Sequence, residues 1–438
     1  MGSEGGVEGE DAGATPERPT PPEEDVNDVL MVGAETGSGK TLSYLLPYVD
    51  AVRRAPEARL KAIVLVPSRE LCWQVAAFLK AYSEDAPPHV VLAGGHPPDV
   101  ADMASVRVVI ATPTALLNYF RFSQRPDASD KMIVVDEADM LLSGSFLRDV
   151  ERILDQPGMK PFATRKNGPV RAVNRNRLLF VGATYPHWTG DRVKSIITWM
   201  RRRYPGVRAV QTEDIHKRSR RLRSRWRHLD TEEQRLDALL EVLESETGET
   251  DKVMVFSSKA STCERVREAV VTRMGEGAVR DKFGEALQLH KNVHSEDRQQ
   301  NLAKYRSDEG RLLFCTDLGS RGLDLGNVTR IVEFEFATNV VVYLHRIGRT
   351  ARAGASGSTD HFYDDVSKPL AEAIRERSEK EGTVVQGVFS RDRSFRRKLK
   401  KTAELKAAEE ANLQSLVRPM DDVVIDEVDA EEAERFNR

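Results

Sequence analysis

A glycine-rich stretch between two apolar segments constrains the fold of this chain more than any other feature. Residues 34–41 read Ala-Glu-Thr-Gly-Ser-Gly-Lys-Thr, after an apolar run at 29–32 and before an apolar stretch at 42–46. Strand, glycine loop and helix in this order form a P-loop, whose backbone N–H groups hold phosphate oxygens. A plain glycine turn is the alternative, but the ending favours a nucleotide site, with Lys40 on the outer phosphates and Thr41 on Mg²⁺. The predicted nucleotide-binding residues here are Ala34, Thr36, Gly37, Ser38, Gly39, Lys40 and Thr41.

Short apolar runs alternate with amphipathic stretches along most of the chain. Continuous Val, Ile and Leu runs are typical of strands buried on both faces of a parallel sheet, and helical patterns such as 70–82 supply the crossovers. Because 438 residues exceed one ordinary core, we predict two α/β domains, 26–212 and 229–388, with a ligand cleft between them. Besides 29–32, the predicted strands are 62–66, 90–93, 106–111, 132–135 and 178–181, then 253–256, 286–289, 312–315, 330–336 and 361–363.

The ends of the chain and the segment between the two series differ from them in composition. Residues 1–25 contain mostly Gly, Glu, Pro and Thr, so we expect an acidic, disordered segment. Residues 201–228 are rich in arginine, and we interpret them as the last helix of the first domain followed by a basic linker at 213–228. This linker is either solvated or in contact with phosphate. Residues 389–438 predict a basic helix and an acidic tail.

Cysteine usage and hydropathy exclude several classes of protein. The three cysteines, Cys72, Cys263 and Cys315, lie far apart without zinc spacing, which indicates a reducing compartment. No apolar run approaches the roughly twenty residues of a membrane helix. The N-terminus has no signal-peptide pattern and is too acidic for a transit peptide. We expect a soluble protein of the cytoplasm or nucleus; the alternative is a mitochondrion or plastid, if an upstream segment carries a targeting peptide.

An acidic pair follows the predicted strand 132–135. Asp136 can hold Mg²⁺ through its water shell, and Glu137 can polarise a water for attack on a γ-phosphate. An exposed acidic turn is the alternative, but a P-loop in the same domain favours catalysis.

Four blocks of sequence together resemble the DEAD-box RNA helicases. They are residues 34–41, residues 136–139 (Asp-Glu-Ala-Asp), residues 316–324 (Thr-Asp-Leu-Gly-Ser-Arg-Gly-Leu-Asp) and residues 345–352 (His-Arg-Ile-Gly-Arg-Thr-Ala-Arg). The blocks stand in the order of that family and span nearly all of residues 30–390. The resemblance implies two tandem RecA-like domains in one monomer, which close over ATP, Mg²⁺ and single-stranded RNA.

The resemblance also assigns roles to individual residues. Arg349 and Arg352 match the arginine fingers of the family, and guanidinium forks suit phosphate geometry, although a basic helix face is the alternative. Asp324 matches the residue that binds the ribose. The residues that would couple the two domains are Asp139, Thr184 and His345.

The RNA contacts of the family fall in loops at strand ends. Such loops hold a sugar–phosphate chain without reading bases. Taken alone, a glycine pair is an ordinary turn and a Thr-Pro pair a helix start. The predicted RNA-binding residues are Pro67, Arg69, Gly94, Gly95, Thr112 and Thr316. The basic segment 391–406 would either add non-specific RNA contacts or form a solvated helix.

The chain departs from the family pattern in four places. No Gln, Phe, Tyr or Trp precedes the P-loop, where the family recognises adenine. We prefer a missing exon to a true loss; if the chain is complete, we expect comparable use of ATP and GTP. Gly182 replaces a serine whose hydroxyl would bond Asp139, so we expect looser coupling. Thr114 and Ala115 replace Gly-Arg, which removes a phosphate contact of about 1 kcal/mol. The residues Ser68 and Cys72 are mild changes.

Two functions from different classes remain after these observations. The first is an RNA-dependent ATPase that separates short duplexes or displaces proteins from RNA. The second is an RNA-binding clamp or scaffold without turnover, with a DNA helicase as a weaker third option. Four residues needed for hydrolysis are all present, which favours the enzyme: Lys40, Glu137, Arg349 and Arg352.

Overall fold

The computed structural model describes residues 29–54, 60–82, 87–94, 105–122, 131–143, 145–156, 158–159, 176–185, 196–212, 221–319, 322–352 and 354–380. The predicted disordered N-terminus, the first part of the predicted linker and the predicted C-terminal helix and tail lie outside these residues. Within the described part, no helix is long and apolar enough to cross a membrane. All three cysteines are buried and free.

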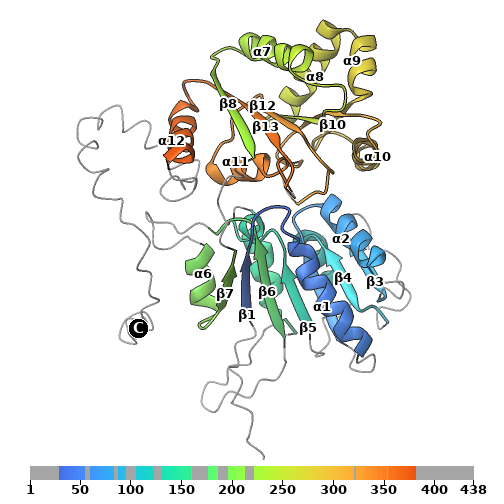
Figure 1. Cartoon of the computed structure of the whole chain (residues 1–438). Helices are drawn as coiled ribbons and strands as arrows, with labels where there is room; N and C mark the ends of the chain where they lie inside the picture. Colours follow the sequence, from blue (N-terminus) through green and yellow to red (C-terminus); the bar gives the residue numbers. More distant parts are fainter. Residues whose placement is uncertain are drawn as a thin grey trace, which may run out of the picture.

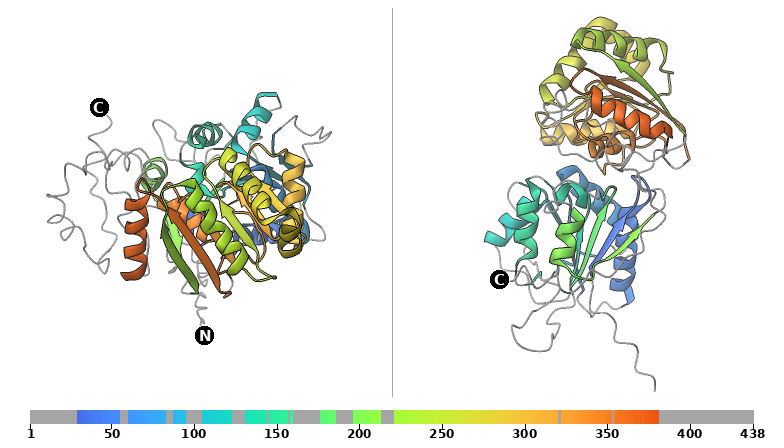
Figure 2. Two further views of the ribbon diagram at one scale, coloured as in Figure 1. Left: turned by 90° about the horizontal axis from the view of Figure 1, so that it is seen from above. Right: turned by 90° about the vertical axis from the view of Figure 1, so that its left-hand side faces the viewer.

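The first domain is a parallel sheet with helices on both of its faces (Figures 1 and 2). Its seven strands lie in the order β3-β4-β2-β5-β6-β1-β7. The strands are β1 Val29–Gly33, β2 Lys61–Leu65, β3 His89–Leu92, β4 Val108–Ala111, β5 Lys131–Val135, β6 Arg177–Gly182 and β7 Arg208–Gln211. The helices are α1 Lys40–Arg54, α2 Arg69–Ala81, α3 Pro113–Phe122, α4 Ala138–Leu141, α5 Phe146–Leu154 and α6 Ile196–Arg203.

The second domain repeats this plan with six strands in the order β10-β11-β9-β12-β13-β8. The strands are β8 Leu222–His228, β9 Val253–Phe256, β10 Ala286–Leu289, β11 Leu312–Cys315, β12 Arg330–Glu333 and β13 Gly357–Tyr363. The helices are α7 Glu232–Ser245, α8 Ala260–Met274, α9 Glu276–Phe283, α10 Ser295–Arg306, α11 Val340–Ile347 and α12 Lys368–Lys380. The prediction of two α/β units with parallel sheets is therefore confirmed.

Strands in the middle of the second sheet match the apolar runs closely. All four residues of β9 and of β11 are buried, and both strands have the predicted bounds, as does the edge strand β10. A strand that is buried on both faces has no alternating polar residues, so its apolar run is continuous and easy to recognise. β12 is shorter than predicted because its pairing with β9 and β13 ends at Glu333.

The linker prediction for 213–228 is wrong over its last seven residues, which form β8. β8 pairs in parallel with β13 at the edge of the second sheet. Two of its three arginines are paired with carboxylates of their own domain: Arg225 contacts Glu246 and Asp360 at 2.5 and 2.6 Å, and Arg227 contacts Glu241 at 2.6 Å. These two arginines therefore belong to the second domain and not to a solvated linker or a phosphate site. The helix before the linker ends at Arg203, and an unpredicted edge strand, β7, follows it.

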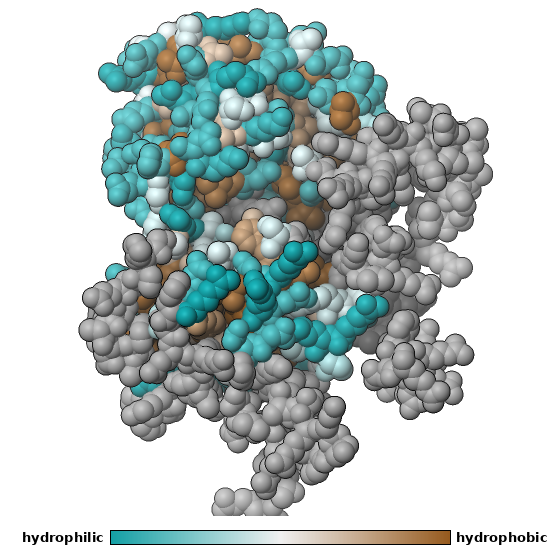
Figure 3. Space-filling model, turned by 180° about the vertical axis from the view of Figure 1, so that it is seen from behind, coloured by the Kyte–Doolittle hydropathy of each residue, from teal (hydrophilic) through white to brown (hydrophobic). Residues whose placement is uncertain are grey.

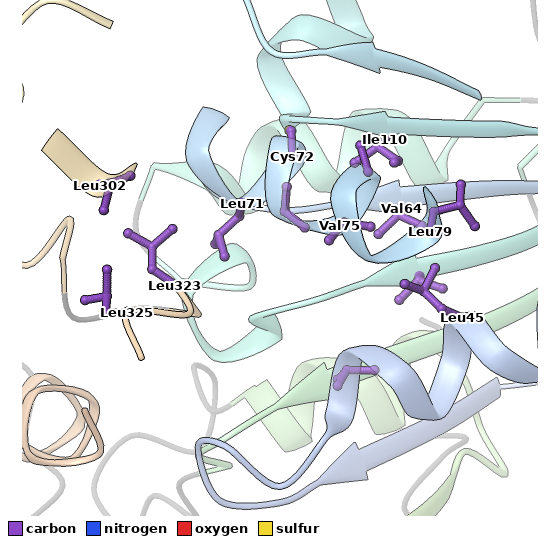
Figure 4. Close-up of a cluster of buried hydrophobic side chains, with 14 of the residues drawn as sticks. Leu45, Val64, Leu71, Cys72, Val75, Leu79, Ile110, Leu302, Leu323 and Leu325 are labelled. Atoms are coloured by element: carbon purple, nitrogen blue, oxygen red, sulfur yellow. The ribbon is translucent and has the colours of Figure 1, made fainter. Parts of the chain in front are cut away.

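The two domains meet through the loops that follow their strands (Figure 1). One cluster of buried apolar side chains runs from α1, α2 and β2 of the first domain to Leu302, Leu323 and Leu325 of the second. Figure 4 shows Leu71 of α2 facing Leu323 across this boundary. On the rear face, hydrophobic residues gather where the two lobes meet (Figure 3). This contact brings the motif-bearing loops of both domains to one place.

Candidate functional site

The P-loop joins β1 to α1 as predicted. Gly37 and Gly39 have φ angles of 84° and 88°, in the left-handed region that favours glycine. Lys40 begins α1, and its Nζ donates to the carbonyl oxygens of Ala34 and Glu35, both at 2.8 Å. The loop therefore curls around an ammonium group at a helix N-terminus, which is the arrangement that binds phosphate.

Two hydroxyl groups of α1 face the acidic motif at the end of β5. The Tyr44 hydroxyl donates to Asp136 Oδ2 at 2.9 Å, and Thr41 Oγ1 lies 3.5 Å from the same oxygen. The other oxygen, Asp136 Oδ1, accepts the N–H of Glu137 at 2.8 Å. Asp136 is thus held beside the hydroxyl of Thr41, the residue with which it was predicted to bind Mg²⁺.

The carboxylates of Asp136 and Glu137 fit a divalent cation. Both side chains are buried, and burial together with the Glu137 charge raises the pKa of Asp136 to about 6. Glu137 Oε2 has no hydrogen-bond partner among the described residues. Glu137 also has a φ of 51°, an uncommon angle for a non-glycine residue that is typical of functional sites. Oxygen donors crowded in this way suit Mg²⁺.

Asp139 links the two domains through a single oxygen. Its Oδ2 accepts the N–H and the hydroxyl of Thr184 at 3.1 and 2.5 Å. The same oxygen lies 2.9 Å from His345 Nε2 of the second domain. His345 is fully buried, and its Nδ1 lies 4.0 Å from Glu137 Oε2. The structure therefore brings together the three residues predicted to couple the domains, beside Glu137, the predicted catalytic carboxylate.

A tyrosine occupies the space next to Gly182. A Cβ atom on Gly182 would lie 3.2 Å from both the hydroxyl and Cζ of Tyr185. Tyr185 is fully buried, and its hydroxyl donates to the carbonyl oxygen of Phe180 at 2.9 Å. The serine that the resemblance predicts at this position is absent, and Thr184 donates two hydrogen bonds to Asp139. Looser coupling stays a prediction.

The segment that carries the two predicted arginine fingers lies against the P-loop. Arg349 is buried and donates from Nη1 to the carbonyl oxygen of Leu323 at 2.5 Å. The side chain of Arg352 packs on Gly37, because a Cβ there would lie 3.2 Å from Arg352 Cδ. Thr36 Oγ1 donates to the carbonyl oxygen of Gly348, at 3.0 Å, and so ties the P-loop to the arginine segment.

Three cations thus converge without a counterion. In the described part of the chain, Lys40, Arg349 and Arg352 form no ion pair within 4.0 Å. Burial lowers the pKa of Arg349, and the charge of Arg352 lowers it further. Burial also lowers the pKa of Lys40, which the carboxylates Glu137 and Asp136 oppose. Arg349 is buried, and Lys40 and Arg352 are half-buried. Charge that is removed from water without a partner is costly, so this cluster suits a polyanion.

Asp324 follows Leu323 on the loop that holds Arg349. Its side chain is exposed, and its charge acts on the nearby Arg352. Its backbone N–H donates to Gln74 Oε1 at 2.5 Å, and Gln74 Nε2 donates to the carbonyl oxygen of Gly322 at 2.8 Å. Gln74, which the sequence did not indicate, therefore holds the predicted ribose-binding loop from the opposite domain.

A second interdomain site is a cavity of about 1340 Å³. Four predicted RNA-binding residues line it: Pro67, Arg69, Gly94 and Thr112. Arg69 packs over Gly94, where a Cβ would lie 2.5 Å from the guanidinium. Thr316 is not among the lining residues, although Leu318 of the same loop is. Gly95 lies outside the described residues.

The second domain closes the cavity with the segment that follows β10. It contributes Lys291, Asn292, Val293, His294, Ser295 and Arg298. Arg298 Nε donates to Glu70 Oε1 of α2 at 2.7 Å, and both side chains are largely buried. The sequence reasoning missed this segment, although polar residues after a parallel strand are a usable signal for a site. It also missed the cavity residues of α3 and α5: Asn118, Tyr119 and Phe146.

Comparisons with known proteins agree with this geometry. Residues 22–192 match the family model described as DEAD/DEAH box helicase, and residues 234–354 match the helicase conserved C-terminal domain. The chain is 30% identical to DEAD-box ATP-dependent RNA helicase 22 of Oryza sativa subsp. japonica, over 86% of this chain and 78% of that protein. It is 30% identical to DEAD-box ATP-dependent RNA helicase 39 of Arabidopsis thaliana, over 79% and 54%.

Two solved structures show the same fold. Mss116p bound to single-stranded RNA and AMP-PNP aligns with a TM-score of 0.66 and 21% identity, over 87% of this chain and 74% of that one. Dbp5 of S. cerevisiae bound to RNA and ADP BeF3 aligns with a TM-score of 0.62 and 21% identity, over 80% and 83%. The prediction of tandem RecA-like domains is therefore confirmed.

Proposed function

The chain belongs to the DEAD-box ATP-dependent RNA helicase family, and we propose that it is an RNA-dependent ATPase that separates short RNA duplexes or remodels RNA–protein complexes. ATP is bound between the P-loop and the arginine segment. Single-stranded RNA lies in the interdomain cavity. One copy of the chain supplies both halves of each site, so a monomer suffices.

The cluster of three cations, Lys40, Arg349 and Arg352, carries this proposal. Lys40 holds the outer phosphates from one domain, while Arg349 and Arg352 reach them from the other. The charge that develops on the transferred phosphoryl group is thereby stabilised only when the domains are closed. Hydrolysis followed by release of phosphate removes part of the negative charge that compensates these cations, which favours opening.

The acidic motif prepares the attacking water. Glu137 accepts a hydrogen bond from that water through its unpartnered Oε2 and takes up its proton. Tyr44 and the Glu137 N–H fix the two oxygens of Asp136, which with Thr41 would hold Mg²⁺. The ion would supply charge neutralisation at the phosphate oxygens.

The cavity is suited to a single strand of RNA. Its loops offer backbone groups, hydroxyls and Arg69 to a sugar–phosphate chain. Arg298 and Glu70 join its two walls, so the strand is held only between closed domains. RNA binding and nucleotide binding therefore favour the same closed state.

Phosphate release, measured with and without RNA, tests the proposal. We expect RNA to stimulate release by the native chain, and Glu137→Gln to reduce the stimulated rate at least about a hundredfold. Single-stranded DNA of the same sequence is the control, and it should stimulate less. Absence of any RNA stimulation would contradict the enzyme and favour the clamp or scaffold.

A further inference from the structure

The interdomain cavity that we propose holds RNA is called the RNA cavity below. One of its walls differs in chemistry from the others. We call it the α3–α5 wall and define it by the cavity-lining residues Thr114, Ala115, Asn118, Tyr119 and Phe146. The first four occupy positions of α3 that are four apart in pairs and so share one helix face. Phe146 begins α5, which packs on α3. The two helices thus present one continuous surface to the cavity.

This wall offers no positive charge to a phosphate. None of its five residues is ionised at neutral pH. The Thr114 hydroxyl, near the start of α3, already donates a hydrogen bond to Asp149 Oδ2 at 2.9 Å. The cationic residues of the cavity, Arg69, Lys291 and Arg298, come from the loops after other strands or from the second domain. A phosphate therefore has better partners elsewhere in the cavity.

The wall does offer two aromatic rings. Tyr119 and Phe146 are half-buried, with one side packed on the core of the first domain and the other lining the cavity. The Tyr119 hydroxyl makes no hydrogen bond to any residue that the structure describes. Rings anchored on a rigid core with a face in a polar groove are the usual platform for an unpaired base, since every base has a π-face.

We propose that the α3–α5 wall is a base-stacking subsite, in which the Tyr119 ring, with Phe146 in the same wall, binds one nucleobase of the RNA strand in place of a phosphate contact. This inference rests on the proposed function, because it needs a single strand in the cavity. The subsite is tolerant of sequence and sensitive to the presence of a base. Stacking at this end of the cavity pulls one nucleotide out of the helical stack, which a duplex cannot provide without losing a base pair.

A scan with abasic RNA tests the subsite on the full chain. The measurement is fluorescence anisotropy of a labelled single-stranded RNA with AMP-PNP and Mg²⁺, with one abasic nucleotide moved along the strand. For the native chain we expect one position at which the missing base weakens binding about tenfold. Tyr119→Leu keeps the apolar packing and removes the ring face; it should bind intact RNA about tenfold more weakly and lose the sensitivity at that position.

Two further variants separate stacking from folding. Tyr119→Trp should retain the position-specific loss, because it restores a ring. Tyr82→Leu removes an exposed ring of the same domain, which is not among the cavity-lining residues and contacts Phe78 instead of Tyr119, and should leave the abasic profile unchanged. Thermal melting of each variant within a few degrees of the native chain shows that the fold is kept.

Three results would overturn the inference. The first is a native abasic profile with no position-specific loss, and the second is the same profile in the native chain and Tyr119→Leu. In both cases intact RNA still binds and stimulates ATP hydrolysis, so the proposed function stands while the subsite falls. The third is a native chain that binds no intact RNA, which overturns the proposed function and the subsite together.

Discussion

The nucleotide site and the RNA cavity lie between the same two domains but differ in whether their cations are paired with carboxylates. In the nucleotide site, Lys40, Arg349 and Arg352 converge with no carboxylate within 4.0 Å in the described chain. In the RNA cavity, the most buried cation, Arg298, is neutralised by Glu70 at 2.7 Å.

The difference teaches what each ligand contributes to closure. The nucleotide site is electrostatically incomplete until a polyanion arrives, so its ligand is needed to hold the domains together. The RNA cavity is already linked by an ion pair and is completed by shape, by hydroxyls and by aromatic surface. We therefore expect charge changes to be most damaging in the first site, and changes to pairing and packing to matter in the second.

The sharpest test of this contrast removes an arginine finger. Arg349→Ala should lower the RNA-stimulated rate of ATP hydrolysis by about a thousandfold, because transition-state charge loses its partner. Arg349→Lys keeps the charge without the fork and should recover only a small part. The control is Arg265→Ala. This change removes an exposed ion pair with Glu232 and should leave the rate at the native value. A loss below tenfold in Arg349→Ala would break the comparison.

The second test breaks the ion pair of the RNA cavity. Arg298→Met leaves Glu70 buried without a partner in the closed state, which favours opening. We expect the RNA-stimulated rate to fall roughly tenfold or more, while the rate without RNA changes little. The double variant Glu70→Gln with Arg298→Met removes the stranded charge and should recover part of the loss. Equal losses in the single and double variants would argue against a closed-state pair.

A smaller effect is expected at Gln74, which links the two domains. Gln74→Ala removes hydrogen bonds to Gly322 and Asp324, at about 1 kcal/mol each. The factor by which AMP-PNP tightens RNA binding should fall roughly five- to thirtyfold. Gln74→Glu keeps the acceptor and loses the donor, so its coupling should lie between the two. If AMP-PNP tightens RNA binding equally in Gln74→Ala and in the native chain, Gln74 does not couple the two ligands.

The smallest effect concerns the missing serine of the nucleotide site. Gly182→Ser places a Cβ 3.2 Å from Tyr185, and we expect a loss of about 1 kcal/mol in the free energy of unfolding. Thermal melting measures it in a double-mutant cycle with Tyr185→Phe, which removes one of the two close atoms. The serine should cost less in the chain that carries Tyr185→Phe. Additive losses would show that the tyrosine does not decide the preference for glycine.

Much of the fold follows from local pattern. Strands buried on both faces, such as β9 and β11, leave an uninterrupted apolar run that any register of the sheet preserves. The P-loop and the acidic motif are also local, because a short segment makes each of them. The sequence therefore placed Lys40, Asp136 and Glu137 correctly in relation to their strands.

Two of the edge strands, β7 and β8, were not predictable in the same way. Edge strands often carry charge, which prevents pairing with other chains. In β8 that charge satisfies carboxylates of α7, β13 and the loop after α7, which lie up to 135 positions away. An arginine-rich strand is therefore indistinguishable from a linker until its partners are known.

By itself the sequence determined two parallel α/β domains, the strand ends that bear the chemistry, and the residue types at those ends. The tertiary structure decided which of these ends meet. Glu70 and Arg298 are 228 positions apart, and Gln74 and Gly322 are 248 apart, so neither pair leaves a periodic signal. The α3–α5 wall exists only because two helices pack side by side. Burial of a strand or helix determines which residue types occur in its local sequence, so it can be predicted from that sequence. A contact between distant residues is fixed only when the domains close.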